Sequence, residues 1–126
     1  METIITDKAP PALGHYAQGI KRGDTIYVSG QLPIDPQDPD KKITDIKEQT
    51  VQTLKNLIEV VKAGGGTANT IVKVTLFITN LDEWPAINEA YATVLGDHKP
   101  TRSAVPVTGL PKGFGIEIEA IAYVQS

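Results

Sequence analysis

The sequence from 115 to 124 is Gly115-Ile116-Glu117-Ile118-Glu119-Ala120-Ile121-Ala122-Tyr123-Val124, and this stretch decides the fold. Successive side chains of a β-strand point to opposite faces, so the pattern predicts a strand with one small, apolar face that packs against helices. The other face begins with two glutamates and then turns apolar. A face that has both charged and apolar side chains is explained if another subunit covers it and the glutamates line a cleft. Solvated charges at a sheet edge are the alternative.

Outward from this strand, the chain alternates between strand and helix patterns. Two short strands are predicted at Tyr16–Ile20 and Thr25–Ser29, around a turn that contains Gly23 and Asp24. Further strands are predicted at Ile71–Thr79, which is rich in β-branched residues, and at Arg102–Thr108. A helix is expected from about Ile46, with Asp45 as its N-cap, and it ends at the glycines 64–66. A second helix should follow Asp82. We therefore expect an α+β fold, in which two helices cover one face of a single sheet.

Composition limits the classes of function. A chain of 126 residues is most consistent with one domain spanning 1–126. The net charge of −3 provides no basic surface for nucleic acid, and the absence of cysteine excludes disulfides and thiolate nucleophiles. No apolar run is long enough to span a membrane, and the N-terminus lacks the features of a signal peptide. We expect a cytoplasmic location.

Arg102 is the first candidate for a binding residue. The chain has only two arginines, Arg22 and Arg102, and a guanidinium can grip a carboxylate through two parallel hydrogen bonds. If the last two strands are antiparallel neighbours, Arg102 and Glu117 can approach one another on the same surface. A structural salt bridge between them is the alternative, and such surface pairs contribute little stability.

Other chemical motifs have little support. The glycines 64–66 are not followed by the Lys and Ser/Thr of a phosphate-binding loop, and they end a helix. His15 and His98 lie far apart in the sequence, so we expect no metal site. Ser29 lacks the flanking glycines of a hydrolase nucleophile elbow.

Eight segments along the chain form a recognisable pattern, which is strongest in the last quarter: Ala9-Pro10, Gly14–Gly19, Val28–Pro33, Val74–Ile78, Asn88–Tyr91, Arg102–Val105, Leu110–Lys112 and Ile116–Ala120. Together they resemble the RidA (YjgF) family of reactive-intermediate deaminases. It implies a chorismate-mutase-like α+β fold assembled as a homotrimer, with sites at the subunit interfaces. It also implies hydrolysis of enamines and imines such as 2-aminoacrylate to 2-oxo acids and ammonia, without a cofactor.

The resemblance also implies roles for individual residues. Arg102 would clamp the substrate carboxylate, and Glu117 would hold and polarise the attacking water. The rest of the substrate pocket would be formed by Tyr16, Ser29, Gly30, Asn88 and Ala104. An imine is already electrophilic, so positioning it against water supplies most of the catalysis.

The sequence departs from the family pattern at two positions. Ala104 stands where many relatives have cysteine, so this position is expected to contribute mainly its backbone. His15 replaces a common proline and adds a titratable group near the mouth of the site.

Two other functions remain open from the sequence. One is a non-catalytic module that binds small carboxylic acids at the same clefts. The other is endoribonuclease activity, which the acidic charge and the lack of a catalytic histidine pair disfavour.

Overall fold

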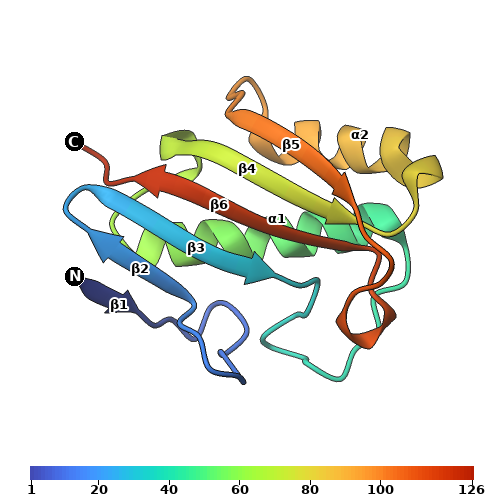
Figure 1. The fold of residues 1–126 in the computed structure, drawn as a ribbon, viewed down its shortest axis with the longest axis horizontal. Coiled ribbons are helices and arrows are strands. Elements are labelled where there is room, and N and C mark those ends of the chain that lie inside the picture. The colour runs from blue at the N-terminus through green and yellow to red at the C-terminus, as the bar shows by residue number, and fades with distance from the viewer.

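The computed structural model describes all residues from Met1 to Ser126 and consists of one six-stranded mixed sheet with two helices (Figure 1). The α+β fold predicted from the sequence is confirmed. The strands are β1 (Glu2–Ile4), β2 (Gly19–Arg22), β3 (Thr25–Gln31), β4 (Ile71–Ile78), β5 (Thr101–Pro106) and β6 (Ile116–Tyr123), and the helices are α1 (Ile46–Ala63) and α2 (Trp84–Leu95).

The order of the strands differs from their order in the sequence. Across the sheet it is β1-β2-β3-β6-β4-β5, so the last strand lies in the middle. β6 runs antiparallel to both β3 and β4, whereas β5 runs parallel to β4 at the edge. A parallel pair needs a crossover connection, and α2 provides it between β4 and β5. The two final strands are therefore separated by β4 and are not the neighbours that an Arg102–Glu117 contact requires.

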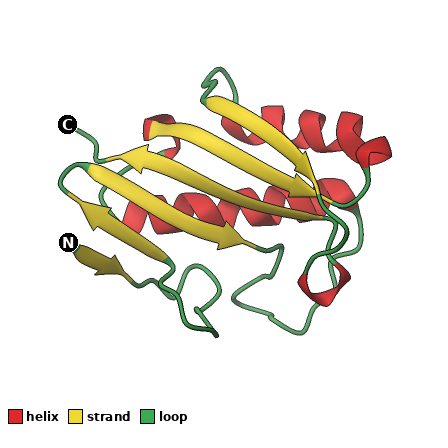
Figure 2. Ribbon diagram, viewed as in Figure 1, coloured by secondary structure: helices red, strands yellow, loops and turns green.

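Both helices pack against the same face of the sheet, as Figure 2 shows. The predicted apolar face of β6 is confirmed, because Ile116, Ile118, Ala120 and Ala122 are buried between the sheet and the helices. They join Leu54, Leu57 and Val61 of α1 and Ile87 of α2 in one core cluster. Burial of these side chains supplies the main stabilisation of the fold.

Helix α1 begins and ends where the sequence predicts. The carboxylate of Asp45 accepts a hydrogen bond of 3.0 Å from the backbone N–H of Glu48, which satisfies one of the free donors of the first turn. The helix ends at Ala63, and Gly64 caps it. Side chains at Gly64 and Gly66 would collide with Ile4 and with the backbone of Tyr123, so close packing requires glycines here.

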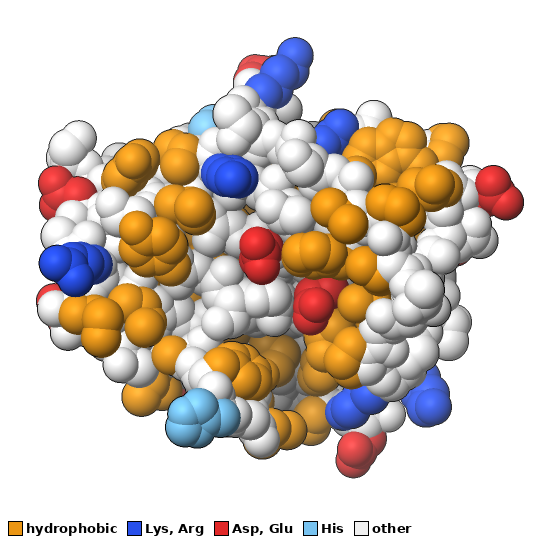
Figure 3. Space-filling model, viewed as in Figure 1, with side chains coloured by type: hydrophobic (Ala, Val, Ile, Leu, Met, Phe, Trp, Pro, Cys, Tyr) orange, Lys and Arg blue, Asp and Glu red, His pale blue; other side chains and the backbone are white.

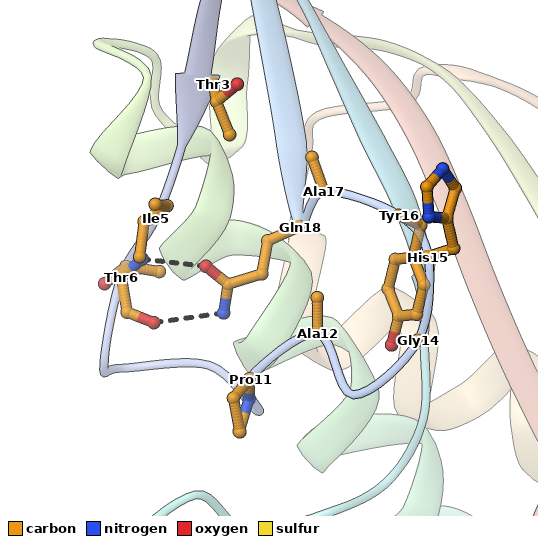
Figure 4. A pocket seen from close by; sticks show the side chains of 10 residues that line it. All are labelled: Thr3, Ile5, Thr6, Pro11, Ala12, Gly14, His15, Tyr16, Ala17 and Gln18. Atoms are coloured by element: carbon orange, nitrogen blue, oxygen red, sulfur yellow. Dashed lines mark hydrogen bonds between the residues drawn. The ribbon is translucent and has the colours of Figure 1, made fainter.

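The N-terminal region differs from the prediction. β1 was not predicted, and the strand expected from Tyr16 begins only at Gly19. The buried side chain of Gln18 explains the difference, because it accepts from the N–H of Thr6 at 2.7 Å and donates to the carbonyl of Thr6 at 3.0 Å (Figure 4). It also donates to the carbonyl of Pro10 at 2.8 Å. These bonds hold the first ten residues beside β2 and leave Tyr16 in a loop.

The face of the sheet opposite the helices is not covered by any element of the chain. Figure 3 looks onto this open face and shows apolar side chains spread over it, with acidic side chains near its centre. Tyr27, Val105 and Tyr123 point to it and are 48%, 38% and 46% exposed. The predicted mixed face of β6, with Glu117 and Glu119, lies here. No helix combines the length and the apolar character that crossing a membrane requires.

Candidate functional site

The predicted site residues lie in two clusters on opposite faces of the sheet. Paired residues of neighbouring strands share a face. Arg102 is paired with Val74, which is buried on the helix side. Glu117 is paired with Phe77, which lies on the open face together with Lys73 and Thr75 of β4.

The first cluster surrounds Glu117 on the open face. It forms an open cleft of about 600 Å³. Phe77 and Glu119 belong to its floor. The remaining lining residues come from the loop before β2, from β3 and the residue after it, and from the loop between β5 and β6: Tyr16, Ser29, Gly30, Leu32, Val107, Leu110 and Pro111. The structure thus brings Tyr16, Ser29 and Gly30 together with Glu117. The cleft combines one carboxylate pair with largely apolar walls.

A β-bulge in β3 shapes this cleft. The pairing of β3 with β6 shifts between Val28 and Gln31, so Ser29 and Gly30 together oppose one residue of β6. A Cβ atom at Gly30 would lie only 2.9 Å from Cδ of Glu117. Glycine at this position therefore permits the carboxylate to lie directly over the strand.

Ser29 is fixed by bonds within the chain. Its hydroxyl donates to the carbonyl of Ala17 at 2.6 Å, and its backbone N–H donates to the carbonyl of Gln18 at 3.0 Å. A hydroxyl has a single proton to donate but two lone pairs. Ser29 can therefore accept a hydrogen bond from a ligand while its own donor is occupied.

The environment of Glu117 favours the protonated carboxyl group. Partial burial raises the pKa of Glu117 above its usual value, and the negative charge of Glu119 raises it further. Within one chain Arg102 does not oppose this shift of the pKa, because it lies on the other face of the sheet. A carboxyl group with a raised pKa is suited to proton transfer near neutral pH.

The second cluster surrounds Arg102 on the helix side. Its Nη1 donates to Oδ1 of Asn88 at 2.9 Å, and its guanidinium carbon lies 4.8 Å from the ring centroids of both Trp84 and Tyr91. The adjoining cavity has a volume of about 450 Å³ and is lined by Asn88, Tyr91, Ala92, Leu95, Gly96, His98, Lys99, Pro100 and Arg102. Arg102, His98 and Lys99 can make this cavity attractive to anions.

The two clusters are far apart within one chain. Arg102 is paired with Val74 of β4, and Val74 is paired with Ala120 of β6. Glu117 therefore lies two strands across the sheet from Arg102 and three residues along β6. These offsets correspond to about 14 Å between the Cα atoms, and the two side chains point to opposite faces. The expected approach of Arg102 and Glu117 on one surface is therefore wrong for a single chain. Ala104 lies on β5, on the same face as Arg102, and is exposed.

Tyr16 links the Glu117 cleft to a further cavity. This cavity, of about 620 Å³, is lined by both His15 and Tyr16 and includes Gln18 at its wall (Figure 4). His15 thus lines this cavity and is not among the residues that line the Glu117 cleft.

Sequence reasoning named Asn88 as a pocket residue but did not identify Trp84, Tyr91 or Gln18. Trp84, Asn88 and Tyr91 are spaced four and three residues apart, which places them on one face of α2, and this spacing is the signal that could have placed the two aromatic residues beside Arg102. Gln18 has no comparable signal, because its partners are backbone atoms near the N-terminus.

Comparison with known proteins identifies the family. The sequence profile of the family described as Endoribonuclease L-PSP matches residues 6–124. The 2-iminobutanoate/2-iminopropanoate deaminase of Mus musculus is 40% identical over 121 residues, covering 96% of this chain and 90% of that protein. A RutC family protein of Pyrococcus horikoshii is 43% identical, and the alignment covers 98% of each chain.

Solved structures agree with the sequence comparisons. The crystal structure of E. coli TdcF with bound serine superposes with a TM-score of 0.95 at 39% identity, covering 99% of this chain and all of that one. RidA from the Antarctic bacterium Psychrobacter superposes with a TM-score of 0.93 at 40% identity, over 98% of this chain and all of that one. Family profile, relatives and fold all agree, and the chain belongs to the Endoribonuclease L-PSP family, which includes RidA, YjgF and TdcF.

Proposed function

We propose that this protein hydrolyses reactive enamine and imine intermediates, such as 2-aminoacrylate and 2-iminobutanoate, to 2-oxo acids and ammonia. The observation that carries this proposal is that the two clusters are complementary, and we call them the Arg102 half-site and the Glu117 half-site. In the first, Arg102 has N–H donors that can bind a carboxylate. In the second, the carboxyl group of Glu117 has a raised pKa and lies in a largely apolar cleft. Two relatives that are 40% and 41% identical, over 90% and 88% of their own length, are named 2-iminobutanoate/2-iminopropanoate deaminase.

The Arg102 half-site binds the common part of the substrates. Every 2-imino acid has a carboxylate next to the imine carbon, and Arg102 retains further N–H donors after its bond to Asn88. The serine bound to E. coli TdcF has a carboxylate in the same position relative to its nitrogen. Ala104, two residues along β5, is proposed to contribute its backbone to the same pocket, so the chemistry proceeds without a cysteine.

The Glu117 half-site performs the proton transfers. Glu117 holds a water molecule and accepts one of its protons as the oxygen attacks the imine carbon. Glu117 returns that proton to the nitrogen, which gives a neutral carbinolamine. It then takes the proton of the new hydroxyl group and passes it to the amino nitrogen, so that the C–N bond breaks, the C=O bond of the 2-oxo acid forms and ammonia leaves. Ser29 accepts a hydrogen bond from the imine N–H, and Tyr16 and Gly30 complete the wall.

A homotrimer with sites at the subunit interfaces would join the two half-sites. A small imino acid cannot span the separation of Arg102 and Glu117 in one chain, so a complete site needs Arg102 and Asn88 of one copy and Glu117 of its neighbour. The open face of the sheet, with exposed Tyr27, Val105 and Tyr123 beside the Glu117 cleft, is the surface that such an assembly would cover.

The proposal is tested by pyruvate release from 2-aminoacrylate that a dehydratase generates in the assay. We expect the native protein to accelerate the release, and Arg102→Ala to lower kcat/KM by about 30-fold or more, because loss of the charged contact to the substrate carboxylate in the assembled site costs about 2 kcal/mol or more. Arg22→Ala is the matched control, since Arg22 is the only other arginine and lies at the exposed end of β2.

Two results would contradict the proposal: no acceleration by the native protein, or an Arg102→Ala variant as active as the control. Binding of pyruvate that depends on Arg102, without turnover of any imine, would instead identify a non-catalytic module for small carboxylic acids.

The raised pKa of Glu117 predicts the pH dependence of the reaction. Glu117 must be ionised to accept a proton, so kcat/KM should fall on the acidic side at a pH above the usual glutamate range. Glu119→Gln removes a negative charge that raises the pKa of Glu117. The fall of kcat/KM at low pH, which is the acidic limb of the pH–rate profile, should therefore move to lower pH. Burial, the larger cause, remains, and the limb should stay above the usual glutamate range.

The pH–rate profile of the Glu119→Gln variant checks this expectation, with Glu2→Gln on the distant β1 as the control. An acidic limb that stays in place or moves to higher pH in Glu119→Gln is inconsistent with the assignment of Glu117 as the titrating base.

A further inference from the structure

The guanidinium of Arg102 lies in a bracket formed by one face of α2. Its central carbon is 4.8 Å from the ring centroids of both Trp84 and Tyr91, and Asn88 between them accepts one N–H bond of 2.9 Å. These three residues form the Arg102 bracket. They come from a single helix, so their relative positions are fixed by the helix geometry.

The bracket acts on an arginine that is otherwise unrestrained. Arg102 is exposed on an edge strand and makes no ion pair within the chain. A free arginine side chain samples many rotamers, and it loses that freedom when it grips a ligand. Contact with two aromatic faces and one hydrogen bond restricts these rotamers before any ligand binds. Contacts with ring faces do not consume N–H donors, so most of the five remain available.

We propose that Trp84 and Tyr91 are positioning residues that hold the fork of Arg102 in the orientation that receives a carboxylate. The inference rests on the proposed role of Arg102 and extends it to two aromatic residues to which we otherwise assign no part in binding. Pre-ordering of this kind lowers the cost of binding and should therefore act on substrate affinity more than on the chemical step.

The hydroxyl group of Tyr91 gives the inference a distinctive consequence. This hydroxyl is buried and has no hydrogen-bond partner, so the ring and not the hydroxyl makes the useful contact. Burial raises the pKa of Tyr91, and the opposing charge of Arg102 does not cancel this effect. Removal of an unpaired buried polar group is neutral or favourable. Tyr91→Phe, which keeps the ring, should therefore leave the order of the Arg102 side chain as it is in the native protein and should be at least as stable.

The order of the Arg102 side chain can be measured without any ligand. The chain has only two arginines, so its ¹⁵N NMR spectrum contains two Nε–H signals, and exposed Arg22 is an internal reference. We expect the Arg102 signal to report a rigid side chain in the native protein and in Trp84→Phe. In Trp84→Leu it should become as mobile as the Arg22 signal. Trp84 is only partly buried, so this variant should fold.

Affinity provides the second readout. In Trp84→Leu we expect the KM for 2-aminoacrylate and the Kd for pyruvate to rise about tenfold while kcat changes little, because the bracket contributes through cation–π contacts. Trp84→Phe, which keeps an aromatic face, should restore most of the affinity. Trp84 is the only tryptophan, so a change in its emission on addition of pyruvate to the native protein should be lost in Arg102→Ala.

The outcomes separate this inference from the proposed function. If the native protein turns over no imine, the deaminase proposal fails, while the NMR measurement still decides whether the bracket orders Arg102. If the native protein is active but Arg102 is as mobile as Arg22, the bracket is refuted. Unchanged mobility, KM and Kd in Trp84→Leu also refute it.

Discussion

Two inactive variants, Arg102→Ala and Glu117→Gln, are expected to restore activity to each other when they are combined in one assembly. Each variant lacks one half-site and keeps the other. In a cyclic homotrimer every interface is heterologous, so it joins one surface of a subunit to a different surface of the next. A subunit that retains Arg102 can then meet a neighbour that retains Glu117, and the site between them is complete.

The expected size of the recovery follows from this geometry. If subunits mix at random in equal amounts, about one site in four receives both functional residues, and activity should reach about a quarter of the native value. If both residues came from the same chain, no mixture could contain a complete site. The separation of Arg102 and Glu117 by two strands and their placement on opposite faces predict the first result.

The measurement is the rate of imine hydrolysis after the two variants are denatured together and refolded, or after they are co-expressed. The matched control mixes Arg102→Ala with the double variant Arg102→Ala/Glu117→Gln. No subunit in this mixture has a functional Arg102, so no site can be complete. Mixed assemblies that are no more active than the separate variants would disprove a site shared between subunits.

Local sequence patterns predicted the elements of the fold well. The alternation in β6 separates a buried face from an open one as expected, and Asp45 caps α1 as expected, because both features depend on residues close together in the sequence. β1 was missed because its three residues contain no pattern of their own. It is held in place by pairing with β2, together with the distant side chain of Gln18.

The sequence predicted the members of the site better than their arrangement. Arg102 and Glu117 were identified, but strand order is a long-range property, and the insertion of β6 between β3 and β4 leaves no local trace. One signal was available: a strand, a helix and a strand in succession favour a parallel pair, which places β5 beside β4. This reasoning would have removed the direct approach of Arg102 to Glu117 within one chain.

The second large effect is expected from a single methyl group at Gly30. A Cβ atom there would lie 2.9 Å from Cδ of Glu117, closer than Cβ atoms approach other heavy atoms in proteins, and 3.1 Å from its Oε2. The backbone of Gly30 is not in the left-handed region, so alanine introduces no backbone strain. The carboxylate is the end of a flexible side chain, so it can move aside at little cost to folding. The expected result is a folded protein with a displaced catalytic carboxylate.

Displacement of a reacting group by about 1 Å can cost 100-fold in rate, and we expect Gly30→Ala to lower kcat by about this factor. Gly109→Ala is the matched control, because a Cβ atom there meets nothing within 4 Å. Steady-state kinetics should be compared with thermal unfolding and oligomeric state for both variants. A Gly30→Ala variant with native kcat would show that the position of Glu117 over β3 is not needed for the reaction. A variant that loses its fold or its assembly would instead show that Gly30 is required for packing.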